Sequence, residues 1–230
     1  VPYLALQYKA VAISLGVLGG QDPDGPALGD PALYVAALMA LFSILFGTRQ
    51  VDATEHRPGM MLAVALESVV KLLALVAVGL FASSWLGARD LDYVAATRAL
   101  VDVAPPVGFV AQCLLAFTAI FCLPRQFHVA IVECGNVADI RRARWMFSAY
   151  LVVITLMVVP IASAGMVLFG TAGEVAPDSF VLALPLAEHR DTLALLAYVG
   201  GFSAATGMVI VASVALATMV SNDLVMPLLL

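Results

Sequence analysis

Two charged residues interrupt an apolar stretch of this chain. Glu67 and Lys71 lie inside the segment 60–86, which is otherwise largely apolar. A charge at the centre of a membrane helix costs about 2.5–3.5 kcal/mol on insertion scales, so two such residues need an explanation. They are four residues apart with the acid first, the favourable order for an ion pair along a helix. The spacing favours an intramembrane charge pair that neutralises itself near the inner interface, ahead of a gate or a proton-relay element.

Hydroxyl side chains recur in the last apolar segment, 193–220. Ser203, Thr206 and Ser213 are separated by three and seven residues, and at about 100° per residue these steps return to one face of a helix. A hard cation such as sodium prefers hydroxyl and carbonyl oxygens, and a small, polar helix face can supply both. Close helix packing explains the pattern equally well, because small residues let helices approach and each hydroxyl can donate to a carbonyl of its own helix. Both interpretations, a sodium site and a packing face, stay open.

Other polar residues follow weaker patterns. Gln112 lies within the segment 105–123, which breaks at the residues 124–128. Such a break is typical of a cytoplasmic helix end, and the alternative is the lining of an inner vestibule. Gln7 and Lys9 lie in an apolar setting in the first stretch, where Tyr8 and Lys9 could anchor the helix at a membrane interface.

Catalytic motifs are absent from the sequence. There is no His-Glu-x-x-His motif, no Gly-x-Ser-x-Gly elbow and no Gly-rich phosphate loop. His56, His128 and His189 lie in three different connections, which argues against a shared metal site. The three cysteines have no metal-ligand spacing. We expect no enzymatic activity from this chain, no cofactor, and no metal other than sodium as a coupling ion.

Composition excludes a water-soluble domain. Of the 230 residues, 63% are hydrophobic and 12% are charged, and the mean hydropathy is +1.02. An average soluble domain is roughly half apolar and about a quarter charged, so this chain could not cover a globular surface with polar side chains. The net charge of −5, with no basic run, argues against nucleic-acid binding. An integral membrane protein is expected.

The apolar residues form six stretches that suit membrane-spanning helices, which need about 20 residues. Helices are expected rather than a β-barrel, because the stretches are continuously apolar and do not alternate. Pro160 lies inside the fifth stretch and should kink it. The predicted spans are 1–20, 31–47, 60–86, 105–123, 146–170 and 193–220.

Arginines set the expected orientation. The connections 48–59 and 124–145 hold six arginines, whereas 21–30, 88–104 and 171–192 hold three. By the positive-inside rule, the first set faces the cytoplasm and the second set lies outside.

The ends of the chain predict a piece of a longer protein. The chain opens with Val1 rather than methionine, no charged region precedes its first apolar stretch, and it stops at Leu230 without a polar tail. We expect an internal fragment, so that function must be argued for a part.

Several motifs together carry a family resemblance. They are the residues 2–11, 46–49, 122–128, 177–181, 200–213 and 218–223. On these motifs the chain resembles the sodium/solute symporter family. It is most similar to the symporter-like membrane domain of bacterial hybrid sensor histidine kinases. The resemblance extends over essentially the whole chain.

The resemblance implies a LeuT-type bundle, with ten core helices in two inverted five-helix repeats. The six spans would be core helices three to eight of a single, partial transmembrane domain, 1–230. Residues 1–87 would end the first repeat and 105–230 would begin the second. The first two and the last core helices would lie elsewhere in the same polypeptide, so this segment would not transport by itself.

The resemblance also implies a sodium site. Members of the family bind sodium with hydroxyl and carbonyl oxygens on core helix eight, in a small-residue segment that resembles Ser203-x-x-Thr206. Thr206 would supply its hydroxyl, and Ser203 its hydroxyl or carbonyl. Family members often have two adjacent hydroxyl residues here, whereas this chain has Gly207 after Thr206 and so has one ligand fewer.

A second segment resembles the family's Gln-Pro-His motif on core helix six. Here it reads Gln126-Phe127-His128, with phenylalanine in place of proline. Gln126 and His128, together with Gln112, are therefore candidate substrate or gate residues.

Two functions are implied. One is sodium-driven uptake of a small amino acid by alternating access. The other is sensing, in which the same fold is the transport or sensing module of a membrane histidine kinase, with histidine as the leading ligand. A ligand biases such a kinase only through different affinities for two states. An ordinary sodium symporter for proline, pantothenate or a similar solute is the alternative. The expected setting is the bacterial inner membrane, as a multi-pass protein. The expected partners are the lipid bilayer, sodium, a small solute, and a C-terminal kinase with its response regulator.

Overall fold

Every described element of this chain is a helix. The computed structural model describes residues 2–19, 31–46, 58–89, 108–122, 131, 134, 136–170 and 175–229. The expected all-α class is confirmed for these residues. In chain order the elements are α1 (Pro2–Gly19), α2 (Pro31–Phe46), α3 (Pro58–Ala88), α5 (Phe109–Cys122), α7 (Val137–Phe169), the 3₁₀ helix η2 (Pro177–Ser179), α8 (Phe180–Ala187), α9 (Asp191–Val220), the π-helical turn η3 (Ser221–Val225) and α10 (Met226–Leu229).

Three helices are long and apolar enough to cross a membrane. The apolar parts of α3, α7 and α9 are 28, 32 and 30 residues long, and about 20 residues are enough to cross the hydrocarbon. They correspond to the third, fifth and sixth predicted spans. The helices α1, α2 and α5 correspond to the other three, with 18, 16 and 14 residues. Large apolar side chains on the outside, such as Leu62 with 72% exposed, agree with a lipid-facing surface.

Prolines and caps explain where several helices begin and end. The first residue of α1, of α2 and of α3 is a proline, whose missing N–H costs little in the first turn of a helix. Asn136 precedes α7, and its side chain accepts a hydrogen bond from the Ala138 backbone N–H at 3.0 Å. Gly170 follows α7 with φ of +75°, a conformation that favours glycine.

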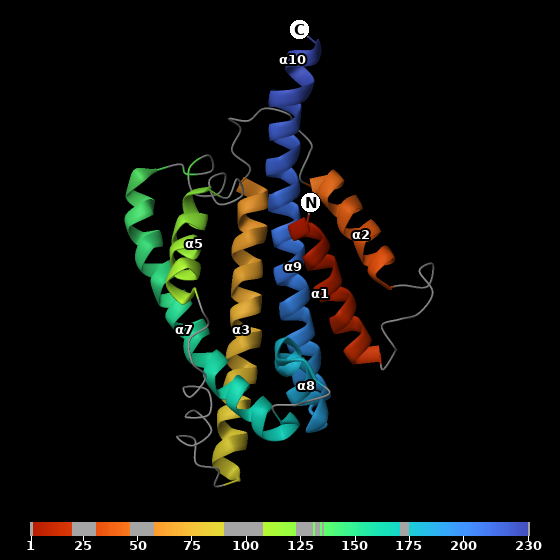
Figure 1. Cartoon of the computed structure of the whole chain (residues 1–230), viewed down its shortest axis with the longest axis vertical. Coiled ribbons are helices and arrows are strands. Elements are labelled where there is room, and N and C mark those ends of the chain that lie inside the picture. Colours follow the sequence, from red (N-terminus) through yellow and green to blue (C-terminus); the bar gives the residue numbers. More distant parts are fainter. Residues whose placement is uncertain are drawn as a thin grey trace.

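Helix α7 begins nine residues before the predicted span 146–170. The predicted connection 124–145 includes Arg141, Arg142 and Arg144, but these residues lie on the first turns of α7. Hydropathy marks only the part of a helix that suits a bilayer, and α7 extends beyond it because its cap lies further upstream. The helix also changes direction along its length (Figure 1), as expected for a helix with Pro160 in its interior.

The predicted outer connection 171–192 contains the short helices η2 and α8. The eight residues of α8 are too few to cross a bilayer, so they bury their apolar side chains against the protein instead. Phe180 and Leu184 are 5% and 0% exposed, in the contact region of α8 with α7 and α9. A Cβ atom on Gly165 of α7 would overlap the Phe180 ring, so the two helices are in close contact there.

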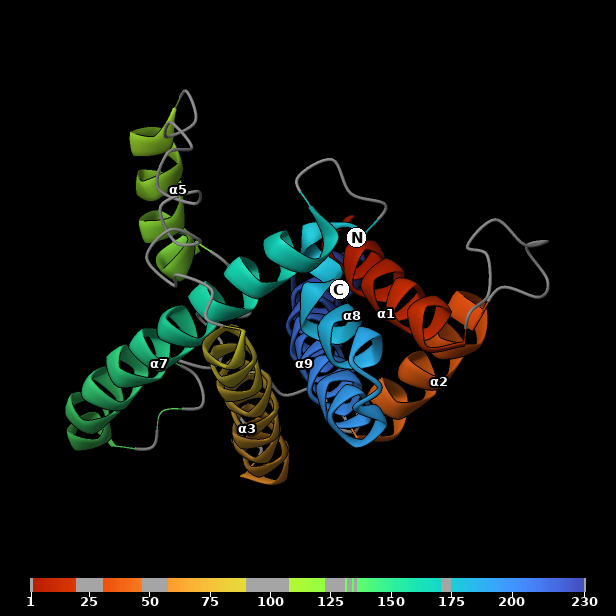
Figure 2. The same ribbon diagram turned by 90° about the horizontal axis from the view of Figure 1, so that it is seen from below.

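Helices α3 and α9 lie side by side at the centre of the bundle (Figures 1 and 2). Helix α7 packs on α3, and α1 and α2 pack on α9. In Figure 1, α1 and α3 run in one direction and α2 and α9 in the opposite one, as the predicted alternation requires. The main core joins α3, α7, α8 and α9 at the end where α8 lies, and a smaller one joins α1, α2 and α9. Helix α5 stands apart from α3 and α9 (Figure 2).

An ion pair connects the end of α3 to the turn between α8 and α9. Arg89 Nη2 donates to Glu188 Oε1 at 3.0 Å, and the Arg89 guanidinium carbon lies 4.0 Å from the centre of the Trp85 ring. Because the Arg89 side chain is 47% exposed, we expect Arg89→Gln to lower the free energy of unfolding by only about 0.5–1 kcal/mol. Chemical unfolding in detergent micelles measures this. A loss above about 3 kcal/mol, typical of a broken buried pair, would contradict the prediction.

Candidate functional site

Glycines bring α3 and α9 into contact at two points. A Cβ atom on Gly200 would overlap the Cβ of Ala74, and one on Gly207 would overlap the carboxylate of Glu67. The contacting residues are seven apart on both helices, in opposite chain directions. This is the spacing of an antiparallel pair of helices that meet along one seam. The Glu67 side chain therefore lies against α9 and not toward lipid.

The predicted ion pair between Glu67 and Lys71 is confirmed. Lys71 Nζ donates to Glu67 Oε1 at 3.4 Å, along one turn of α3. The side chains are 12% exposed for Glu67 and 26% exposed for Lys71. The contact with Gly207 explains why the acid is the more buried partner. The charge of Glu67 is therefore neutralised by Lys71 of the same helix, and its position is set by the contact with α9.

The hydroxyls of α9 lie beside this contact. Ser203 precedes Gly207 by one helical turn on the same face, and Thr206 is its immediate neighbour. Thr206 Oγ1 donates to the Phe202 carbonyl at 2.8 Å, as the packing interpretation predicted. A hydroxyl that donates still has oxygen lone pairs free to accept or to bind a cation. The Ser203 hydroxyl makes no hydrogen bond within the described ranges, and it is half-buried.

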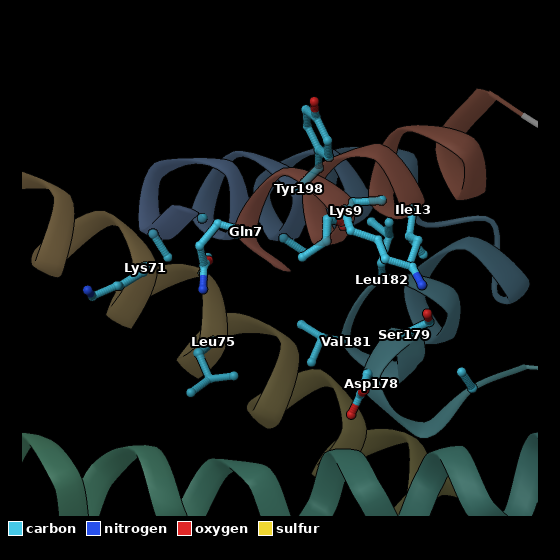
Figure 3. Close-up of a pocket in the computed structure, with 18 of the residues that line it drawn as sticks. Gln7, Lys9, Ile13, Lys71, Leu75, Asp178, Ser179, Val181, Leu182 and Tyr198 are labelled. Atoms are coloured by element: carbon cyan, nitrogen blue, oxygen red, sulfur yellow. The ribbon is translucent and has the colours of Figure 1, made fainter. Parts of the chain in front are cut away.

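A cavity of about 790 Å³ lies between α1, α3, α7, α9 and the η2–α8 segment (Figure 3). Leucine, isoleucine, valine and alanine side chains form most of its wall. From α9 the lining consists of Tyr198 and of small residues that leave the space open, namely Ala197, Gly200, Gly201 and Ala204. Volume and lining are those of a site for a small solute. Its polar lining includes Gln7, Lys9, Lys71, Tyr150, Asp178 and Ser179.

The cavity and the hydroxyls lie on different faces of α9, because neither Ser203 nor Thr206 lines the cavity. The charge pair connects the two regions. Lys71 lines the cavity, and its partner Glu67 lies against Gly207. A change at one region can therefore reach the other through a single ion pair.

The other predicted site residues are not brought to this region. Gln112 lies exposed on α5, which stands apart in Figure 2. Gln126 and His128 lie outside the described residues, as does His56. His189 lies between α8 and α9, with φ of +54°. No group of three or more histidine, cysteine, aspartate or glutamate side chains that could hold a metal ion occurs in the described part of the chain.

Lys9 and Asp178 are charged cavity residues to which sequence reasoning gave no solute-binding role. The sequence predicts Lys9 as an anchor at a membrane interface. Asp178 belongs only to the segment 177–181, one of the motifs of the family resemblance. The signal for Lys9 was a charge in the middle of an apolar helix, the same signal that drew attention to Glu67. Nothing local indicated that Asp178 would share a cavity with it.

Comparisons of the chain with protein-family models, with curated proteins and with solved structures give no match, so the symporter resemblance stays a prediction that rests on the motifs themselves.

Proposed function

We propose that this chain is part of a sodium-coupled symporter-like domain that binds a small solute, with histidine as the leading candidate. In this proposal all six predicted spans cross the bacterial inner membrane, as core helices of a LeuT-type bundle. The domain serves as the transport or sensing module of a membrane histidine kinase.

The position of Glu67 carries the proposal. Its carboxylate lies on Gly207, the position at which the symporter resemblance leaves one hydroxyl ligand missing. With the hydroxyls of Ser203 and Thr206 alongside, the donors are a carboxylate and two alcohols. Hard cations prefer oxygen ligands of this kind. The donor set therefore fits sodium, with Glu67 in the place of the absent hydroxyl.

Lys71 supplies a physical route for coupling. The ammonium of Lys71 and a sodium ion beside Ser203 would both neutralise the same Glu67 carboxylate. Sodium binding then weakens the ion pair between Glu67 and Lys71, and Lys71 lines the solute cavity. The affinity of the cavity thereby depends on the occupancy of the ion site, as coupled binding requires.

Sodium-dependent uptake tests the proposal. Full-length protein in liposomes should take up labelled histidine at least about tenfold faster with an inward sodium gradient than with choline, and Thr206→Ala should remove most of that difference because a cation ligand is lost. Thr218→Ala is the matched control, because Thr218 Oγ1 makes the same bond to its own helix, to the Val214 carbonyl at 2.9 Å. Equal uptake in choline, or an unaffected Thr206→Ala variant, would rule out the sodium assignment.

A second readout needs no knowledge of the solute. Sodium chloride should raise the unfolding temperature of the full-length protein above that in choline chloride at equal ionic strength, since a ligand that binds only the folded state stabilises it. Thr206→Ala should abolish this difference and Thr218→Ala should keep it.

The sensing part of the proposal has its own test. Adding histidine to full-length protein in sodium buffer should change the rate of autophosphorylation. Uptake without any effect on phosphorylation, or a polypeptide that contains no kinase, would leave the ordinary symporter as the function.

A further inference from the structure

Two opposite charges line the cavity without contacting each other. Lys9 comes from α1 and Asp178 from η2, and both side chains reach the same space. Within the described ranges, neither side chain forms an ion pair or a hydrogen bond. Lys71 also lines the cavity, but its ammonium is already paired with Glu67. Lys9 and Asp178 are therefore the cation and the anion that remain available to a solute.

The two charges lie at the same end of the cavity. Figure 3 shows Lys9, Ser179 and Asp178 together at one end, and Gln7 and Lys71 at the other. The wall between the two ends carries apolar side chains, among them Leu75 and Val181, so it provides no competing charge there. A solute would meet Lys9 and Asp178 at one end, then an apolar passage, and then the Gln7 amide beside Lys71, which is paired with Glu67.

We propose that Lys9 and Asp178 bind the head group of a zwitterionic α-amino acid. The proposal deepens the proposed function and rests on it for the role of the cavity as the solute site. The Lys9 ammonium binds the carboxylate and the Asp178 carboxylate binds the ammonium, because charge-assisted hydrogen bonds are the strongest that such a solute can make. The side chain of the amino acid then extends along the apolar wall toward Gln7. A solute that carries a carboxylate alone leaves Asp178 without a partner.

Binding of three probes to the full-length protein tests the assignment. The probes are histidine, histamine, which lacks the carboxylate, and imidazolelactate, which lacks the ammonium. Calorimetry in sodium buffer should give a histidine affinity at least about tenfold above that of either analogue. Lys9→Gln should lower the histidine affinity at least about tenfold and leave histamine unchanged. Asp178→Asn should lower the histidine affinity similarly and leave imidazolelactate unchanged.

Controls separate recognition from structural damage. Lys9→Arg keeps the charge and should retain histidine binding. Thr155→Ala should change none of the affinities, because Thr155 does not line the cavity and donates to its own helix, to the Leu151 carbonyl at 2.9 Å. Unfolding temperatures of all variants should stay close to that of the native protein, since both charged side chains are exposed to the cavity.

The outcomes distinguish this inference from the proposed function. Sodium-dependent histidine binding that survives both Lys9→Gln and Asp178→Asn would overturn the inference and leave the proposed function standing. Loss of histidine affinity in both variants, with equal binding in sodium and choline, would support the inference and remove the sodium coupling. If none of the twenty amino acids raises the unfolding temperature of the native protein in sodium buffer, the inference is wrong.

Discussion

Lys71→Met is expected to destabilise the protein more than the simultaneous removal of both charges in Glu67→Gln/Lys71→Met. The single substitution leaves the Glu67 carboxylate, only 12% exposed, against Gly207 without its cation. Breaking a fully buried pair costs about 3–5 kcal/mol, and the 26% exposure of Lys71 reduces the expected loss to about 2 kcal/mol. Because the double variant leaves no unpaired charge, it should recover most of that loss. Chemical unfolding in detergent micelles measures all three proteins.

The Arg89–Glu188 pair provides the matched comparison. It has a shorter distance, 3.0 Å against 3.4 Å, but its arginine is 47% exposed. If burial rather than distance decides the cost, Lys71→Met should cost more than Arg89→Gln. Equal losses in Lys71→Met and in the double variant would mean that the length and packing of the lysine chain, not its charge, stabilise this turn of α3.

Gly200→Ala should lower the free energy of unfolding by about 1–3 kcal/mol, whereas Gly201→Ala should be neutral or stabilising by up to about 1 kcal/mol. The two glycines are adjacent in α9, so they share a helix, a depth and a propensity. A Cβ on Gly200 would overlap the Cβ of Ala74, which cannot rotate away, so α3 and α9 would have to separate. No atom lies within 4 Å of a Cβ on Gly201. Thermal and chemical unfolding of the two variants make the comparison.

A second substitution tests the cause of this loss. Ala74→Gly removes the atom that the new methyl group would meet, so Gly200→Ala/Ala74→Gly should regain stability relative to the sum of the two single variants. Additive losses would show that the contact between these residues does not limit the approach of α3 to α9.

Much of the helical arrangement could be predicted because its causes are local. The pair of Glu67 and Lys71 follows from a spacing of four residues, which is a property of one helix. The apolar stretches of α3, α7 and α9 could be predicted because each is a continuous run of apolar residues. The start of α7 could not be obtained in this way, because hydropathy ignores the helical turns that carry Arg141 and Arg142. That all six predicted spans cross a membrane remains a prediction, for which α3, α7 and α9 are long and apolar enough.

The candidate site depends on contacts that join distant parts of the chain. Glu67 meets Gly207, and Lys9 shares a cavity with Asp178. No local pattern encodes either meeting, because each depends on how the helices pack. Gly207 leaves room for the Glu67 carboxylate because glycine has no side chain. The role predicted for the hydroxyls of Ser203 and Thr206 stays a prediction, and neither residue lines the cavity.

The seam between α3 and α9 also limits how this bundle can move. If α9 moved along its axis by one residue, it would shift by about 1.5 Å. The residue brought to each contact would then point about 100° away from the glycine direction, so both glycine contacts would be lost together. Because Gly200 and Gly207 are spaced like Ala74 and Glu67, both contacts hold only in a single axial register. We therefore expect the two helices to move together as one unit. Under the proposed function, we expect a motion that admits a solute to involve the elements around this pair, α1 and η2 among them.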